Sequence, residues 1–101
     1  MANVFEAVNR SFTAAAQATD WLILAAGQGA TVQINATAMS ATIDLEYRPG
    51  DQGPTNVVEQ YTANTVRNVR FEAPCQVRLN SSAFTSATAL TVSAEPRNPT
   101  F

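Results

Sequence analysis

The sequence predicts an all-β protein, and three observations support this prediction. Residues 40–48 alternate between apolar and polar side chains, so that Ile43, Leu45 and Tyr47 share one face of a half-buried strand. Only 14% of the residues are charged and neither Lys nor His occurs, so the surface takes its polarity from Thr, Asn, Ser and Gln. Short apolar runs separated by turn residues recur at intervals of roughly ten residues. The expected fold is a single β-sandwich, jelly-roll or immunoglobulin-like, of about seven to eight short antiparallel strands.

The chain is expected to form one domain with two arms. Its 101 residues, 46% of them hydrophobic, are enough for one core, and no repeat or linker divides them. Residues 2–11 fit either a capped helix or a strand, and we favour an extended N-terminal arm over residues 1–9 that leads into a strand at residues 10–14. Two prolines interrupt any strand over residues 96–101, which we expect to form a C-terminal arm.

The apolar residues before the central strand predict a hairpin. Residues 21–26 form a short apolar run, which favours a strand buried on both faces. After a glycine turn, residues 30–35 predict its partner strand, with Val32 and Ile34 facing inward. The central strand then ends at the Pro- and Gly-rich residues 49–54, which predict an exposed loop.

The second half of the chain predicts four more strands. Residues 57–62, 66–73 and 76–80 alternate, and the chain turns between them at Asn- and Pro-containing links. Residues 81–87 are small and polar around Phe84 and are expected to form a loop, after which residues 89–94 form the last strand. The side chains expected to face inward are Val58, Tyr61, Val69, Phe71, Val77, Leu79, Leu90, Val92 and Ala94.

Charge and cysteine content argue against several partner classes. The net charge is −2 and the six arginines form no basic stripe, so we expect no nucleic-acid binding. Cys75 is the single cysteine, which excludes an intrachain disulfide and a cysteine metal quartet. The chain shows no basic-then-apolar leader and no apolar run that could span a bilayer, so we expect a protein made and folded in a cytoplasm with no membrane partner.

The titratable residues predict a protein that is not an enzyme. Asp44 and Glu46 lie on one strand face, but no His or Lys is available to share acid–base chemistry with them. Cys75 likewise lacks a general base, and the loop after Pro49 has too few carboxylates for Ca²⁺. We expect no catalytic residues, no cofactor and no metal. The carboxylates are expected to pair across strands with arginines, among Arg48, Arg70 and Arg78.

Several short motifs together resemble a known class of proteins. They are Arg10-Ser-Phe-Thr, Thr31-Val-Gln-Ile, the central strand running into Gly50-Asp-Gln-Gly, Glu72-Ala-Pro-Cys-Gln-Val-Arg-Leu and the last strand. This order resembles small β-sandwich structural proteins of tailed-phage virions, over most of residues 10–95. Those proteins carry Asp-Gly-Gly followed by an aromatic residue where this chain has Gly50-Asp-Gln-Gly, so we assign the loop no ligand. The resemblance implies a virion component, a head decoration (cement) protein or a tail-associated module.

We therefore expect a virion protein that decorates the capsid, binds major capsid subunits or other virion proteins, and forms a homo-oligomer, with a homotrimer favoured. The arms supply the expected partner contacts, which are Phe5, Val8, Arg97 and Phe101. The sandwich edges are expected to be covered by assembly, since no Lys is present to protect them.

Two alternatives stay open. One is a tail, neck or fibre module of the same fold. The other is a carbohydrate-binding β-sandwich that uses Trp21 or loop residues near Asp51 and Phe84. The apolar residues around Trp21 and the inward phase of Tyr47 favour core positions for both rings.

Overall fold

The structure is a computed structural model that describes residues 7–50 and 53–97. These residues form eight β-strands joined by turns and irregular segments. The strands are β1 (Val8–Ser11), β2 (Leu22–Leu24), β3 (Gly29–Asn35), β4 (Ala38–Pro49), β5 (Asn56–Tyr61), β6 (Thr65–Arg70), β7 (Cys75–Thr88) and β8 (Thr91–Arg97).

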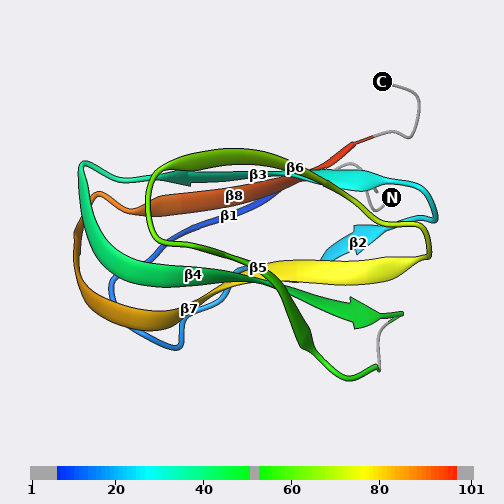
Figure 1. The fold of residues 1–101 in the computed structure, drawn as a ribbon, viewed down its shortest axis with the longest axis horizontal. Coiled ribbons are helices and arrows are strands. Elements are labelled where there is room, and N and C mark those ends of the chain that lie inside the picture. Colours follow the sequence, from blue (N-terminus) through cyan, green and yellow to red (C-terminus); the bar gives the residue numbers. More distant parts are fainter. Residues whose placement is uncertain (1–6, 51–52, 98–101) are drawn as a thin grey trace.

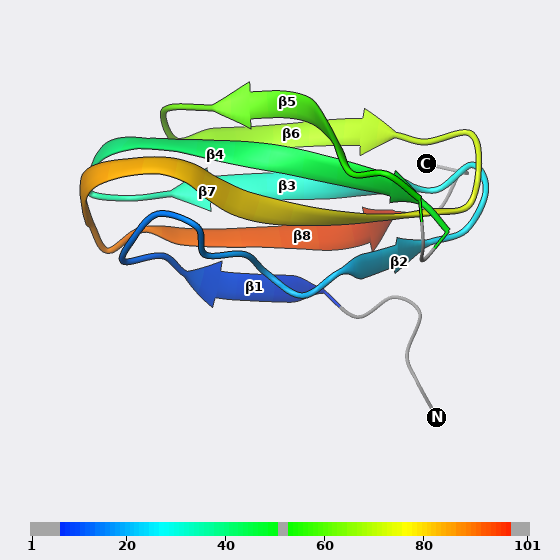
Figure 2. The same cartoon turned by 90° about the horizontal axis from the view of Figure 1, so that it is seen from below.

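The strands pack as two four-stranded antiparallel sheets, and this confirms the predicted β-sandwich. Sheet A has the order β1-β8-β3-β6 and sheet B the order β2-β7-β4-β5. The two layers lie face to face in Figure 1, and Figure 2 shows that β5 and β6 lie along one side of the sandwich while β1 and β2 lie along the other. Each side of the sandwich therefore consists of one edge strand from each sheet.

The core lies between the sheets and follows the predicted alternation. In sheet B, Ile43 and Leu45 of β4 and their neighbours Val77 and Leu79 of β7 are fully buried. Sheet A covers them with buried side chains of β3 and β8. The inward residues of these two strands are Ala30, Val32, Ile34, Val92 and Ala94.

The predicted loop at residues 81–87 is wrong, because β7 runs without interruption from Cys75 to Thr88. Its second half pairs with residues 38–42 of β4, which lie 41 to 50 positions earlier in the chain. Register shifts in β4 at Ser40/Ala41 and Thr42/Ile43 accommodate the change in alternation. The small residues of this segment carry no local strand signal, so the long-range pairing alone makes them a strand.

The predicted hairpin between residues 21–26 and 30–35 is also wrong. The strands form, but β2 pairs with β7 in sheet B while β3 pairs with β6 and β8 in sheet A. The chain therefore crosses from one sheet to the other at the glycine turn. As an edge strand, β2 buries only one face, and Ile23 is 62% exposed where burial on both faces was expected.

Strands extend into both expected arms, since β1 already begins at Val8 and β8 ends only at Arg97. Val8 and Asn9 belong to β1 and pair with Ala94 and Ser93. Pro96 and Arg97 belong to β8 and pair with Ala30 and Gly29.

Candidate functional site

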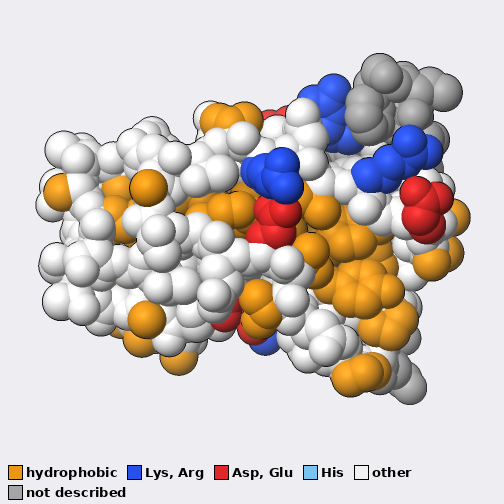
Figure 3. Space-filling model, viewed as in Figure 1, with side chains coloured by type: hydrophobic (Ala, Val, Ile, Leu, Met, Phe, Trp, Pro, Cys, Tyr) orange, Lys and Arg blue, Asp and Glu red, His pale blue; other side chains and the backbone are white. Residues whose placement is uncertain are grey.

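The two strands on one side of the sandwich carry exposed apolar side chains. We call the side formed by β5 and β6 the β5/β6 edge. It exposes Val57, Val58 and Val66, whose side chains are 50%, 40% and 70% accessible. Figure 3 views the molecule from this side and shows hydrophobic side chains at the surface between the two sheets. Neither strand contains the Lys or Pro that commonly protects an edge, so the surface is suited to contact with another chain.

Val58 is exposed rather than inward as predicted, and it lies at a β-bulge. Leu45 pairs with Glu59 but the next residue, Glu46, pairs with Val57, so Val58 is an extra residue in β5. The alternation beyond the bulge is kept, and Tyr61 is buried as expected. Counted in twos from the buried Tyr61, Val58 falls in the outward phase, so the inward predictions for Val58 and Tyr61 could not both hold.

Glu59 and Arg67 join the two sheets across this edge. Arg67 Nη2 donates to Glu59 Oε2 at 2.8 Å and Arg67 Nε donates to Oε1 at 3.0 Å. Tyr61 donates its hydroxyl to Glu59 Oε1 at 2.8 Å. The hydrogen bond from Arg67 lowers the pKa of Glu59, and burial together with Glu59 raises the pKa of Tyr61. These hydrogen bonds connect β5 to β6, while the valines of the two strands remain at the surface.

A hollow lies at one end of the β5/β6 edge. The rings of Tyr47 and Phe71 stack with their centroids 5.6 Å apart and an angle of 8° between their planes. They line a hollow of about 360 Å³, whose other lining residues are Val58, Arg70, Glu72 and Ala73. The aromatic floor and charged rim could receive an apolar side chain from a partner.

The opposite side of the sandwich is better covered. Residues 14–19 run along the open edge of β7, where the amides of Ala16 and Thr19 donate to the carbonyls of Ser81 and Leu79. The Ser81 hydroxyl is fully buried and bonds to Ala14 O and Gln17 N. This segment pairs the backbone groups that β7 would otherwise expose.

The predicted contact residues are distributed as follows. Val8 lies in β1, half-buried against the core, and Arg97 ends the neighbouring strand β8, where its Nη1 donates to Thr31 Oγ1 at 3.3 Å. Phe5, Phe101 and Asp51 lie outside the described residues. The residues of the β5/β6 edge were not predicted as contacts. The sequence could have predicted one of them. Because Val69 and Phe71 face inward, the period of two in β6 places the side chain of Val66 on the outer face.

Trp21 lies outside the core, contrary to expectation. It is partly exposed, and the guanidinium carbons of Arg48 and Arg78 lie 4.1 and 4.5 Å from its ring centroid. Arg78 Nε also bonds to Glu46 at 2.7 Å, which confirms the expected cross-strand pairing on the outer face of sheet B. The ring is therefore held by the charged residues of β4 and β7 instead of by core side chains.

Asp44 departs from the expected exposed position. It is buried, and its Oδ1 accepts a hydrogen bond from Gln60 Nε2 at 2.9 Å. Its partner is thus an amide of β5 rather than an arginine.

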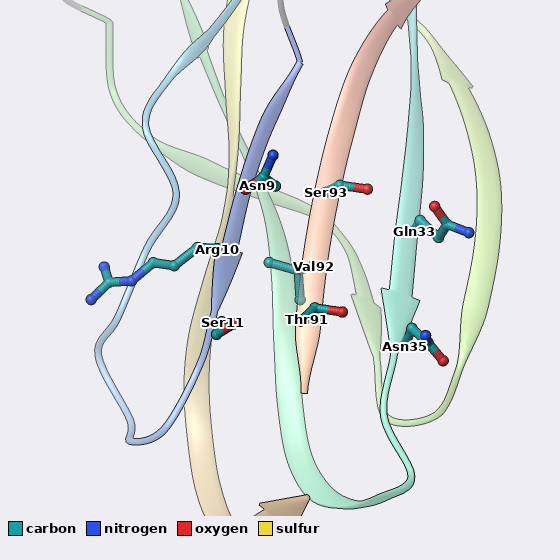
Figure 4. Close-up of a pocket in the computed structure, with 8 residues that line it drawn as sticks. All are labelled: Asn9, Arg10, Ser11, Gln33, Asn35, Thr91, Val92 and Ser93. Carbon is teal, nitrogen blue, oxygen red and sulfur yellow. The ribbon is translucent and has the colours of Figure 1, made fainter. Parts of the chain in front are cut away.

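A shallow polar hollow lies on the outer face of sheet A (Figure 4). Strand register places Asn9, Ser93 and Gln33 in one row across β1, β8 and β3. Ser11, Thr91 and Asn35 form the next row, and Arg10 points away from both. The face offers hydroxyl and carboxamide groups without a charged group among these six side chains.

Cys75 is buried and burial raises its pKa to about 11, so its thiol stays protonated at neutral pH.

Within residues 7–50 and 53–97, no cluster of three or more His, Cys, Asp or Glu side chains could hold a metal ion. The same residues include no helix that is long and apolar enough to cross a membrane.

Comparisons with known proteins add no family to this description. A scan against protein-family models finds no match, and neither the curated proteins nor the solved structures yield a significant match.

Proposed function

We propose that this protein is a non-enzymatic structural protein of a phage virion, a capsid decoration protein that binds major capsid subunits. The observation that carries the proposal is the β5/β6 edge, where Val57, Val58 and Val66 are exposed on edge strands that contain no Lys or Pro. The resemblance of the sequence motifs to small virion β-sandwiches supports the choice of a virion partner. The cores of protein interfaces contain few charged residues, and this chain has no Lys and only 14% charged residues, which suits a surface covered by partners.

The proposed mechanism combines strand-edge pairing with burial of apolar side chains. A partner strand laid along β5 or β6 would pair with its open backbone groups, and the exposed valines would be buried in the contact. Burying one valine side chain contributes at most about 1.5–3 kcal/mol, so one edge alone binds weakly. Assembly as a homotrimer would present three such edges together and raise the overall affinity through multivalency.

Binding to capsids tests this function directly. The double variant Val57→Lys/Val66→Lys places protective charges on the edge, and Ile23→Lys places one on β2 at the opposite side as a matched control. We expect the wild type and Ile23→Lys to co-sediment with purified tailed-phage heads and the double variant to remain in the supernatant. Urea unfolding should show that all three are folded.

Two outcomes would contradict the proposal. A wild-type protein that never co-sediments with heads removes the decoration function. A double variant that co-sediments like the wild type leaves the function but removes the β5/β6 edge as the interface. A protein found in rings or fibres rather than on heads would support the tail, neck or fibre alternative.

The exposed position of Trp21 favours a second candidate function, carbohydrate binding. A partly exposed indole beside Arg48 and Arg78 on the outer face of sheet B could stack on a sugar ring, and Gln76, which accepts a hydrogen bond from Arg48, adds a polar group nearby. Glycan-array binding that is lost in Trp21→Ala and unaffected by Val57→Lys/Val66→Lys would support it. An array without signal would exclude it for the glycans present.

A further inference from the structure

One end of the sandwich is built from segments that contain no charged residue. Strand register identifies this end, because Ser11 of β1 and Asn35 of β3 both pair with Thr91 of β8, and Ala38 of β4 pairs with Thr88 of β7. Figure 2 shows the turn between β5 and β6 at the same end, on the left. We call it the charge-free end, and its residues are 11–19, 33–43, 61–65 and 79–94.

The charged side chains are concentrated on the rest of the sandwich. Figure 3 shows them at the centre and on the right, with the charge-free end on the left. At the border of this end, Arg67 pairs with Glu59 at 2.8 Å. Arg10, which is exposed, donates from its Nη1 to Ala18 O at 2.7 Å. These two guanidiniums are therefore directed to acceptors of this chain.

Hydroxyl and carboxamide groups give the charge-free end its polarity. Ser11, Thr91 and Asn35 form a row on the outer face of sheet A (Figure 4), and the turns expose Thr37 and Thr62. A hydroxyl or a carboxamide both donates and accepts hydrogen bonds, whereas a guanidinium only donates and a carboxylate only accepts. The same surface on two copies can therefore form hydrogen bonds with itself, and no like charges are brought together.

Two half-buried apolar side chains lie in this surface. Met39 of β4 and Phe84 of β7 pack against the core and remain partly accessible. Together with small and polar side chains of β4 and β7 and with Thr62, they line a hollow of about 360 Å³ on sheet B. Aromatic residues and Met are enriched in protein interfaces, whose cores contain few charged residues. A partner that covers the hollow would remove both side chains from water.

The charge-free end is large enough for a stable contact. The molecule measures 36 × 28 × 25 Å, and the strands run along its longest dimension (Figure 1). An end of 28 × 25 Å offers about 700 Å² per copy, so two copies that meet there would bury roughly 1,400 Å² together. Stable protein–protein contacts bury about 1,200–2,000 Å².

We propose that copies of this chain associate through the charge-free end, each seated on the same end of another copy. A second copy is the occupant that these observations favour, because groups that both donate and accept are complementary to themselves, whereas a charged partner surface finds no opposite charge here. The homo-oligomer is part of the proposed function, but the contact itself needs no capsid. Association through this end leaves the β5/β6 edge, on the side of the sandwich, open to a capsid partner.

Sedimentation equilibrium of the full chain over a range of concentrations tests the contact. The double variant Thr37→Glu/Thr62→Glu places carboxylates in exposed turns of the charge-free end, and Thr55→Glu/Ala73→Glu adds the same charge at exposed positions of the other end as the matched control. We expect the wild type and the control to associate alike. The dissociation constant of Thr37→Glu/Thr62→Glu should rise at least about tenfold, because like charges would meet. Urea unfolding should show that all three proteins are folded.

The salt dependence of the same measurement tests the chemistry of the contact. Because the wild-type contact contains no charged group, its dissociation constant should change less than about threefold between about 50 mM and about 500 mM NaCl. High salt should restore part of the association of Thr37→Glu/Thr62→Glu, because it screens the added carboxylates. A wild-type dissociation constant that rises more than about tenfold with salt would overturn the proposal, since ion pairs would then hold the copies together.

The remaining outcomes separate this contact from the decoration function. A wild type that stays monomeric would overturn the contact even if it co-sediments with heads. Association unchanged in Thr37→Glu/Thr62→Glu would overturn this end as the interface. A wild type that associates but ignores heads would support the contact and reject the decoration function. A monomeric wild type whose head binding is lost only in Thr37→Glu/Thr62→Glu would overturn the second copy as the occupant and assign this end to the capsid.

Discussion

Glu59 of β5 and Arg67 of β6 form an ion pair that connects the edge strands of the two sheets, with Arg67 Nη2 and Glu59 Oε2 2.8 Å apart. Glu59 lies opposite the buried Leu45, in the inward phase of sheet B, and the Tyr61 hydroxyl also donates to it. The opposite sheet therefore supplies the guanidinium that balances the charge of this carboxylate.

We expect Glu59→Gln to change the pH dependence of stability. Because the folded pKa of Glu59 is lowered by Arg67, its contribution is fully present above the unfolded pKa of about 4.3 and is lost as the pH falls through the folded pKa. Urea unfolding should therefore show the wild type more stable than Glu59→Gln at pH 7 and the two nearly equal at pH 2. A stability difference that is the same at both pH values would contradict the assigned charge interaction.

Ser81→Ala should destabilise the protein by about 1–3 kcal/mol, because the fully buried hydroxyl bonds to Ala14 O and Gln17 N and its loss leaves both groups unpaired. The neighbouring Ser82→Ala is the matched control, since Ser82 is exposed and should change stability by less than about 0.5 kcal/mol. Chemical denaturation of the two variants measures the difference. Equal stabilities would mean that residues 14–17 are not held to β7 by this hydroxyl.

Gly29→Ala should cost about 1–3 kcal/mol, because the new methyl group would lie 2.7 Å from the Val69 carbonyl and the strands would have to separate. Gly50→Ala serves as the comparison. Its methyl group meets nothing within 4 Å, so only the strain of φ +59° applies, about 1 kcal/mol. Thermal unfolding of both variants shows which of the two substitutions lowers the stability more. A tolerated Gly29→Ala would show that β3 and β6 can separate at this point.

The Cys75 thiol should resist modification in the folded protein. Burial raises its pKa to about 11, so at pH 8 almost no thiolate is present and reagent cannot reach the sulfur. Ellman's reagent should react within the mixing time in urea and at least about a hundredfold more slowly without it, at the rate of transient opening. Rapid modification of the native protein would contradict the buried position.

The alternation of the chain was sufficient to predict several elements and the side chains that they bury. Ile43 and Leu45 of β4, and Val77 and Leu79 of β7, are buried as their period of two requires. This succeeds because the alternation is local. A strand that presents apolar residues on one face has to cover that face whichever neighbours it pairs with.

Other features were decided by distant neighbours. The segment from Ser81 to Thr88 becomes a strand because the distant β4 pairs with it. Trp21 contacts arginines of β4 and β7, although its outward position also has a local signal, because Leu22 and Leu24 alternate inward beside it.

The candidate surfaces likewise have features that the alternation predicts and features that depend on strand pairing. Composition and alternation were enough to predict a charge-poor β-sandwich with no Lys on its edges. Strand pairing was needed to place Val57, Val58 and Val66 together on the β5/β6 edge and to bring the segments of the charge-free end together. Register across strands is a long-range property, set by which residues meet when the sheets close, and the alternation within one strand does not contain it.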